Sequence, residues 1–280
     1  MRGGEMFKRN GLWLSIALMA ASGACATSAP SAPQIASAPP AAHARAAPSS
    51  RLYSFHCLDG ACPAVAGDGN SLIVREIYAL SANPATKLAD WVAYVVTPAT
   101  VGPSQSRGWA ADPWLPEDET LEPEDYRDAN AVLGTDRGHQ APLAAFSGTP
   151  HWPSTNFLSN ITPQMAPLNQ GPWERIEARE RELARAGASV HALTGPLFER
   201  EMPALPEANE AHAVPSGYWK VVVIEDAAAA FIFDQGTPRG ADFCDHEVEI
   251  SEIETRAHLA LFPRRSEPFD ALSARLGCTG

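Results

Sequence analysis

Short runs rich in β-branched and aromatic residues most constrain the fold of this 280-residue chain. Such runs, bounded by turn residues like the Asn83-Pro84 pair, are typical of β-strands. The runs are residues 71–80, 90–97, 190–194, 218–224 and 228–233. We expect the first two to pair antiparallel, and the last two to pair around Glu225-Asp226-Ala227.

Helical spacing is clearest over residues 172–186, where Trp173, Ile176 and Leu183 recur on one face. Pro172 suits the first position of a helix, and a second helix is expected over residues 250–261. Strands and helices do not alternate regularly, so we predict an α+β fold on a mainly antiparallel sheet. The sequence contains no internal repeat, Gly-rich phosphate loop or Rossmann fingerprint.

The N-terminus is not expected to belong to the fold. Lys8 and Arg9 precede a short apolar run, which predicts a signal peptide over residues 1–25. Residues 26–50 are almost entirely Ala, Pro and Ser, a composition typical of a flexible tether. A single folded domain over residues 51–280 remains.

Cys25 admits two interpretations. The small residues that run into it resemble a bacterial lipoprotein processing site, at which Cys25 would be lipidated, although Ser22 replaces the usual aliphatic residue. Ordinary signal cleavage after Ala26 is the alternative. Either way the protein is expected to be exported, to the periplasm, to the medium or to a lipid anchor on the bacterial envelope.

The chain has five cysteines, and removal or lipidation of Cys25 leaves four. Export makes disulfides plausible, and sequence alone allows three pairings. Locality favours Cys57 with Cys62 and Cys244 with Cys278. A four-thiolate zinc site is disfavoured, because the pairs lack its short two-residue spacing.

The net charge of −12 conflicts with the basic patches expected of a nucleic-acid binder. Part of the excess is local, since residues 112–128 contain eight carboxylates and one arginine and suggest a solvated loop. An enzyme that releases its product needs only a locally positive cleft. If the chain binds nucleic acid, the composition therefore predicts that this binding is weak and salt-sensitive.

Residues 136–142 read Asp-Arg-Gly-His-Gln-Ala-Pro, and Asn169 follows thirty residues after His139. A histidine base, a metal ligand and the Arg137 guanidinium are what phosphodiester hydrolysis requires. Each residue also has a simpler interpretation. Asn169 could only cap the helix that follows, and Glu177 with Arg181 could form an i, i+4 ion pair.

Several motifs together resemble the DNA/RNA non-specific endonuclease family, and the likeness extends from about residue 55 to the end. The motifs are residues 136–142, 160–164 and 168–177, with flanking matches at 91–94, 194–197, 218–220 and 240–244. The resemblance implies a ββα-metal motif on a six-stranded antiparallel sheet with flanking helices. It also implies two disulfides, in agreement with the pairing favoured above.

The resemblance also implies roles for single residues. His139 resembles the general base that activates water, and Asn169 resembles the direct protein ligand of a hydrated Mg²⁺. Glu177 resembles the carboxylate that holds the metal's waters, and Arg107 resembles the arginine that stabilises the pentacovalent phosphate.

Four further residues are implied to handle the substrate: Arg137, Arg181, Asn160 and Gln164. We expect a Mg²⁺-dependent endonuclease, with Mn²⁺ as the alternative metal, that cleaves DNA and RNA to 5′-phosphate ends. Its expected partners are these substrates, a membrane reached through lipidated Cys25, and a second copy in a homodimer. The alternatives are a catalytically silent surface nucleic-acid-binding protein and a nuclease restricted to one polymer.

Overall fold

A computed structural model describes residues 54–63 and 69–278, all of which belong to one compact unit. The predicted signal peptide, the tether and Cys25 lie outside the described residues. Among the residues that are described, no helix is long and apolar enough to cross a membrane.

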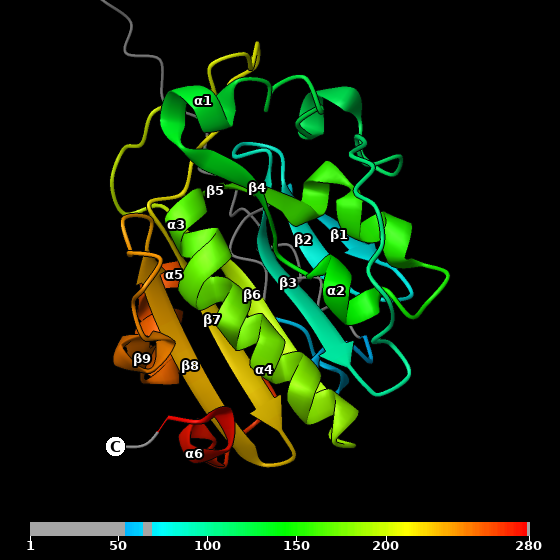
Figure 1. The fold of residues 1–280 in the computed structure, drawn as a ribbon, viewed down its shortest axis with the longest axis vertical. Coiled ribbons are helices and arrows are strands. Elements are labelled where there is room, and N and C mark those ends of the chain that lie inside the picture. The colour runs from blue at the N-terminus through cyan, green and yellow to red at the C-terminus, as the bar shows by residue number, and fades with distance from the viewer. Residues whose placement is uncertain (1–53, 64–68, 279–280) are drawn as a thin grey trace, which may run out of the picture. The chain divides into compact units, whose positions relative to one another are not determined.

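Six strands of four to nine residues form one antiparallel sheet, which confirms the α+β prediction (Figure 1). In sheet order they are β1 (Ser71–Val74), β2 (Ala79–Asn83), β3 (Leu88–Val96), β6 (Val190–Leu197), β7 (Gly217–Ile224) and β8 (Ala227–Asp234). The two-residue strands β9 (Glu247–Val248) and β10 (Asp270–Ala271) both pair with β8, and β10 runs parallel to it. The six-stranded core of the prediction is therefore present with short additions at one edge.

Two strand and loop predictions need correction. The run 71–80 is not one strand, because the chain turns at Arg75, whose amide donates to the Tyr78 carbonyl, and divides the run into β1 and β2. The 112–128 stretch is not wholly solvated, because Asp112 and Asp125 are buried. Asp112 forms an ion pair with the buried Arg75, a long-range partner that a local pattern does not reveal.

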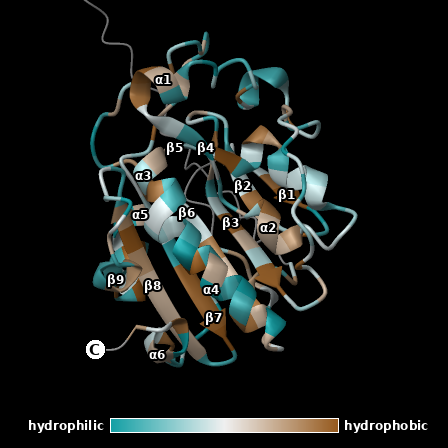
Figure 2. Ribbon diagram, in the orientation of Figure 1, coloured by the Kyte–Doolittle hydropathy of each residue, from teal (hydrophilic) through white to brown (hydrophobic). Residues whose placement is uncertain are grey.

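Both faces of the sheet are covered, and successive side chains of β7 pack alternately into two separate cores. Tyr218 and Val222 pack into the core beneath helix α4 (Glu174–Arg185). Trp219 and Val221 pack into the core beneath α5 (Ile250–Ala257). The strands are accordingly apolar along most of their length, whereas α4 carries hydrophilic residues on its outer side (Figure 2). Lys220 is the charged exception on β7, and it is fully buried on the α4 side.

The other α-helices among the described residues are short: α1 (Ala129–Leu133), α2 (Leu143–Phe146), α3 (Ala166–Leu168) and α6 (Ser273–Leu276). Five 3₁₀ helices are also present: Leu58–Gly60, Glu117–Glu119, Trp152–Asn156, Leu158–Asn160 and Phe243–His246. The predicted helix 172–186 begins later than expected, because a π-helical turn, Asn169–Trp173, precedes α4 and contains Pro172. The predicted helix 250–261 ends earlier, at Ala257, because His258 adopts a left-handed conformation.

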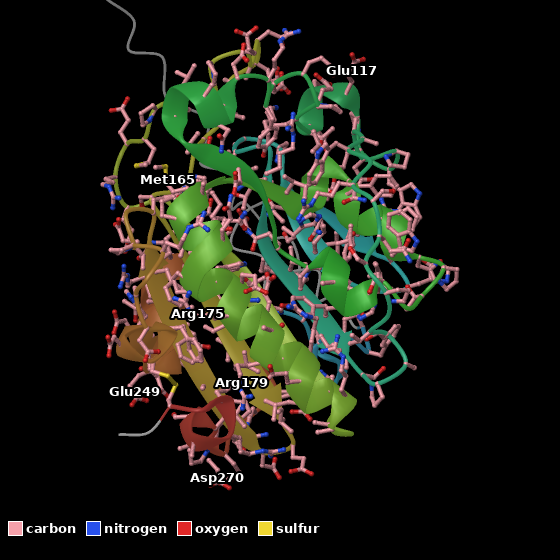
Figure 3. All side chains as sticks on the ribbon, in the orientation of Figure 1. Glu117, Met165, Arg175, Arg179, Glu249 and Asp270 are labelled. Atoms are coloured by element: carbon pink, nitrogen blue, oxygen red, sulfur yellow. A yellow bond between two sulfur atoms is a disulfide. The ribbon has the colours of Figure 1, made fainter. Side chains whose placement is uncertain are left out.

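Two arginines of α4 fasten the helix to the C-terminal part of the chain (Figure 3). Arg175 donates to the backbone carbonyls of Arg239 and Ala241. Arg179 donates to the carbonyls of Leu276 and Arg275. These contacts hold α4 in place from its outer side, while its apolar face packs on the sheet.

A separate two-stranded sheet lies beside the N-terminal end of α4. It pairs β4 (Thr135–His139) with β5 (Ile161–Met165) in antiparallel register, so that His139 lies opposite Ile161. Gly138 is required here, because a Cβ atom at this position would lie 2.6 Å from the Gln164 side chain. Together β4, β5 and α4 form the predicted ββα unit.

The structure contains both disulfides that locality favours, Cys57–Cys62 and Cys244–Cys278. Disulfides persist in oxidising compartments, so this pair of bridges indicates an extracytoplasmic protein. The second bridge closes a loop of 34 residues and joins the chain end to the segment after β8.

Removing the two disulfides should destabilise the protein unequally. Loop-closure entropy gives a loss of about 4 kcal/mol for Cys244→Ser with Cys278→Ser and about 2 kcal/mol for Cys57→Ser with Cys62→Ser. Urea unfolding of the oxidised parent and both double variants would measure this difference. A larger loss from the short bridge would show that loop length does not govern its contribution.

Candidate active site

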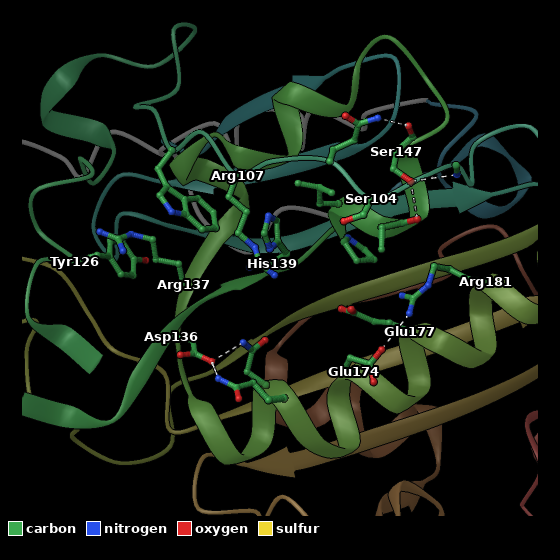
Figure 4. Close-up of a pocket in the computed structure, with 18 of the residues that line it drawn as sticks. Ser104, Arg107, Tyr126, Asp136, Arg137, His139, Ser147, Glu174, Glu177 and Arg181 are labelled. Carbon is green, nitrogen blue, oxygen red and sulfur yellow. Dashed lines mark hydrogen bonds and ion pairs between the residues drawn. The ribbon is translucent and has the colours of Figure 1, made fainter. Parts of the chain in front are cut away.

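A cleft of about 740 Å³ lies between the β4 strand and the face of α4 that carries Glu177 and Arg181 (Figure 4). Arg107 and His139 approach it from one side, and Glu177 and Arg181 approach it from α4. Four arginines and three carboxylates line it: Arg107, Arg137, Arg181, Arg185, Asp136, Glu174 and Glu177. The cleft is therefore locally positive in a chain whose net charge is −12.

His139 stands at the end of β4 with its ring held on two sides. Its Nε2 atom lies 3.1 Å from Asn156 Oδ1, and the Trp109 ring lies 5.2 Å from the imidazole. Because the amide oxygen only accepts, Nε2 carries the proton and Nδ1 carries the free lone pair. Burial, together with the charge of Arg107, lowers the pKa of His139 to about 4. The ring is therefore neutral at ordinary pH and able to accept a proton.

Asn169 lies at the start of the π-helical turn, and Asp136 fixes the orientation of its amide. Asn169 Nδ2 donates to Asp136 Oδ2 over 2.9 Å, which leaves the amide oxygen for a ligand. Gln170 donates to the same carboxylate oxygen, and Asn130 donates to the other. Sequence reasoning gave Asp136 no role of its own, although its place beside Arg137 and His139 in the 136–142 motif was a signal.

Glu177 lines the cleft from α4, with only 12 % of its side chain exposed. Burial raises the pKa of its carboxyl to about 7, although the buried Lys220 ammonium, 4.0 Å away, opposes this shift. A cation bound in the cleft would favour the ionised carboxylate further.

The three predicted arginines all reach the cleft, in different settings. Arg107 is exposed on the loop before Trp109. Arg137 donates to the Pro123 carbonyl, and its guanidinium lies 5.7 Å from the centre of the Trp109 ring. Arg181 forms an ion pair with Glu174 over 3.1 Å rather than the expected i, i+4 pair with Glu177.

Asn160 and Gln164 do not line the cleft, in contrast to the expectation. Both side chains are fully buried. Asn160 accepts from the Ala141 amide and donates to the carbonyls of Ala141 and Thr155, so it clamps the segment that follows His139. Gln164 packs on Gly138. Motif membership reveals that these residues matter, but not that they act through packing.

The donor set fits a hard divalent cation. Asn169 offers an oriented amide oxygen, and Glu177 offers a carboxylate that burial has destabilised in its charged form. Oxygen ligands of this kind suit Mg²⁺, which keeps several waters and takes few protein ligands. Among the described residues that line the cleft there is no thiol, and the one histidine is held by Asn156, so a softer metal is not favoured.

A neutral histidine base, an oxygen-ligand site and several arginines on a ββα unit define the class of metal-dependent nucleases. Comparison with known proteins places the chain within that class. Residues 63–267 match the DNA/RNA non-specific endonuclease family, which covers well over half of the chain. The chain belongs to this family of metal-dependent nucleases and is a nuclease with DNA and RNA substrates.

Individual relatives agree with this assignment. A nuclease of Serratia marcescens is 50% identical over 208 residues, which cover 72% of this chain and 78% of the relative. Human mitochondrial endonuclease G is 30% identical over 165 residues, covering 55% of this chain and 54% of its own length. A crystal structure of the EndoG/EndoGI complex matches the fold with a TM-score of 0.61 at 22% identity, covering 70% of this chain and 86% of that chain.

The lowered pKa of His139 should make stability depend on pH. Since the folded pKa of about 4 lies below the unfolded value of about 6.5, the unfolded chain binds more protons between these values. The stabilisation from neutral His139 is therefore present above about pH 6.5 and is lost as pH falls toward 4.

The variant His139→Gln should lose less stability than the parent on acidification, by up to about 2 kcal/mol between pH 7 and pH 5. Urea unfolding across that range would measure the difference. His151→Gln is the control, because His151 is exposed and lies outside the cleft. Parallel pH profiles for the parent and His139→Gln would contradict the pKa assignment.

Proposed function

We propose that this protein is a Mg²⁺-dependent endonuclease that hydrolyses DNA and RNA without sugar specificity and leaves 5′-phosphate ends. The observation that carries the proposal is the pairing across one cleft of a neutral, Asn156-oriented His139 with the Asn169 and Glu177 oxygen ligands. Mn²⁺ is the alternative metal, since it accepts the same oxygen donors.

His139 acts as the general base. Nδ1 takes a proton from the attacking water, whose oxygen forms a bond to phosphorus while the bond to the 3′ oxygen breaks. Asn156 holds the ring in the tautomer that leaves Nδ1 free, and Trp109 limits its rotation. The low pKa keeps the base unprotonated at the pH where it must act.

Asn169 would ligate the metal directly, and Glu177 would accept hydrogen bonds from the metal's waters. When bound, the metal supplies positive charge to the scissile phosphate and to the departing oxygen. Asp136 orients Asn169 through its amide nitrogen, and Lys220 lies 4.0 Å from the carboxylate of Glu177. These supporting residues determine where the ligand oxygens stand.

The arginines bind and steady the phosphate. Arg107 is exposed and close enough to His139 to lower its pKa, so it is suited to stabilise charge that develops at the reacting phosphate. Arg137 and Arg181 are partly fixed by their own partners and are suited to bind the neighbouring backbone. Asn160 and Gln164 contribute by packing β4 and β5 rather than by touching substrate.

Asp136→Ala should weaken Mg²⁺ binding by roughly 10–100-fold, because the Asn169 amide loses the acceptor that orients it. Titration calorimetry with Mg²⁺ alone, without nucleic acid, measures this change independently of activity. Asp245→Ala, which removes the same charge from an exposed position outside the cleft, is the control. Equal Mg²⁺ affinity in the parent and both variants would exclude Asp136 as an orienting residue.

His139→Ala should reduce cleavage by roughly 10²–10⁴-fold, the range for loss of proton transfer. The assay follows nicking and linearisation of supercoiled plasmid in Mg²⁺ and in EDTA, with His151→Ala as the control. Oxidised protein from about Arg51 onward is used. Cleavage by His139→Ala at the parent rate would remove His139 from the chemistry.

The same assay separates the proposal from its two alternatives. Failure of folded parent protein to cleave plasmid or RNA with any divalent metal at low salt would favour a silent nucleic-acid-binding protein. Cleavage of RNA but not of single- or double-stranded DNA, or the reverse, would restrict the enzyme to one polymer.

We also propose that the chain is exported through residues 1–25 and tethered by residues 26–50, with Cys25 as the lipidation candidate. The two disulfides support export, because they need an oxidising compartment. Lipidation of Cys25 and pairing of two copies into a homodimer stay predictions.

A further inference from the structure

The cleft continues along α4 well past the residues that the proposed chemistry uses. Glu174, Glu177, Arg181 and Arg185 all line it, and their spacing of three, four and four residues places them on one face of the helix. Arg185 is the last residue of α4. The wall of the cleft therefore runs from the metal ligands to the C-terminal end of the helix.

Arg185 differs from the other arginines of this helix. Arg175 and Arg179 donate to backbone carbonyls of the C-terminal segment, and Arg181 pairs with Glu174. Arg185 is exposed, and no hydrogen bond or ion pair joins it to any other residue that the structure describes. Within the described part of the chain it is thus a cation without a partner, on the wall of a cleft.

Part of the cleft lining is polar but uncharged. Ser147 Oγ donates to the Ala144 carbonyl and accepts from the Gly102 amide, and Gln105 donates to the Ser147 carbonyl. These groups satisfy one another and bring no charge to the cleft. The aromatic residues of the cleft, Trp109 and Tyr126, lie beside Arg137 instead. A ligand near Arg185 would be recognised by its charge rather than by base stacking.

The distance along the helix suits a nucleic-acid strand. Arg185 lies eight residues beyond Glu177, which is ~12 Å along the helix axis. A stacked strand advances about 3.4 Å per nucleotide, so this distance corresponds to about three to four nucleotides. A guanidinium is well matched to phosphate oxygens, which it can engage through two parallel hydrogen bonds.

We propose that Arg185 forms a distal subsite that binds a backbone phosphate three or four nucleotides from the scissile bond. The subsite rests on the proposed function, because it extends the same cleft. It makes longer strands bind more tightly than short ones, without sequence preference. An alternative role for Arg185 is to complement the negative end of the α4 dipole, which would affect stability and not substrate binding.

The test compares the parent with Arg185→Gln on oligonucleotides graded from dinucleotides to about twelve nucleotides. For the longest strands, KM should rise roughly five- to eightfold at 0.1 M salt, and the slope of log KM against log salt should fall by about 0.7–0.9. The KM ratio of variant to parent should grow with strand length. Arg185→Lys should restore the salt slope, because the slope depends on charge, but only part of the affinity, because an ammonium cannot form the two parallel hydrogen bonds.

Arg200→Gln is the matched control, since it removes the same charge from an exposed arginine outside the cleft. A KM and salt slope for Arg185→Gln equal to those of Arg200→Gln at every length would overturn the subsite. A loss of equal size on the shortest and longest strands would also overturn it, because the contact would not be distal.

Failure of the subsite is distinguishable from failure of the proposed function. If the parent cleaves and Arg185→Gln behaves as Arg200→Gln, only the subsite is wrong. If the parent cleaves nothing, the proposed function is wrong. In that case, fluorescence anisotropy of a long oligonucleotide in EDTA still tests whether Arg185 contacts the strand. The Kd of Arg185→Gln should then show the same fold-change and the same fall in salt slope that are expected for KM.

Discussion

The buried charge of Lys220 determines how α4 sits on the sheet. Its ammonium lies 3.1 Å from Glu180 Oε1 and 2.8 Å from the Tyr94 hydroxyl, and all three side chains are fully buried. A buried charge without a partner is strongly destabilising, so Glu180 must lie directly over β7. Glu180 is three residues from Glu177 and one from Arg181. Once its position is set, the register of α4 decides which of its residues face the cleft.

The second wall of the cleft is positioned by β4, and the two walls are joined through Asp136. Its carboxylate accepts from Asn169 at the start of the π-helical turn, so the strand that carries His139 also orients the Asn169 amide. Gly171 allows this turn to lie against the backbone of Arg239, since a Cβ atom would come within 2.7 Å of it. His139 and Asn169 are therefore held by separate elements whose relative position rests on polar contacts.

Much of the fold and of the candidate site could be predicted from sequence, and the remainder depends on contacts between residues that are distant in the chain. Strands of β-branched residues and the amphipathic spacing of α4 are local signals, and they gave the α+β fold. The division of the run 71–80 was missed because Arg75 is stabilised by Asp112, 37 residues away. The cleft positions of His139, Asn169 and Glu177 follow from the motif. That Asn160 and Gln164 are buried, and that Asp136 is the orienting residue, depends on pairing between β4 and β5.

The conflict between an acidic chain and an anionic substrate is resolved by how the charges are distributed. Several surface carboxylates are neutralised locally, as in the pairs Arg256–Glu199 and Arg200–Asp234. Asp112 is buried against Arg75. Within the cleft, by contrast, Arg107 and Arg185 have no carboxylate partner among the residues that the structure describes. Short-range attraction inside the cleft then acts against long-range repulsion by the rest of the surface. Salt screens both the attraction and the repulsion, but weakening the repulsion does not supply phosphate contacts. The net effect of salt on strand binding therefore depends on the number of free arginines that the strand reaches.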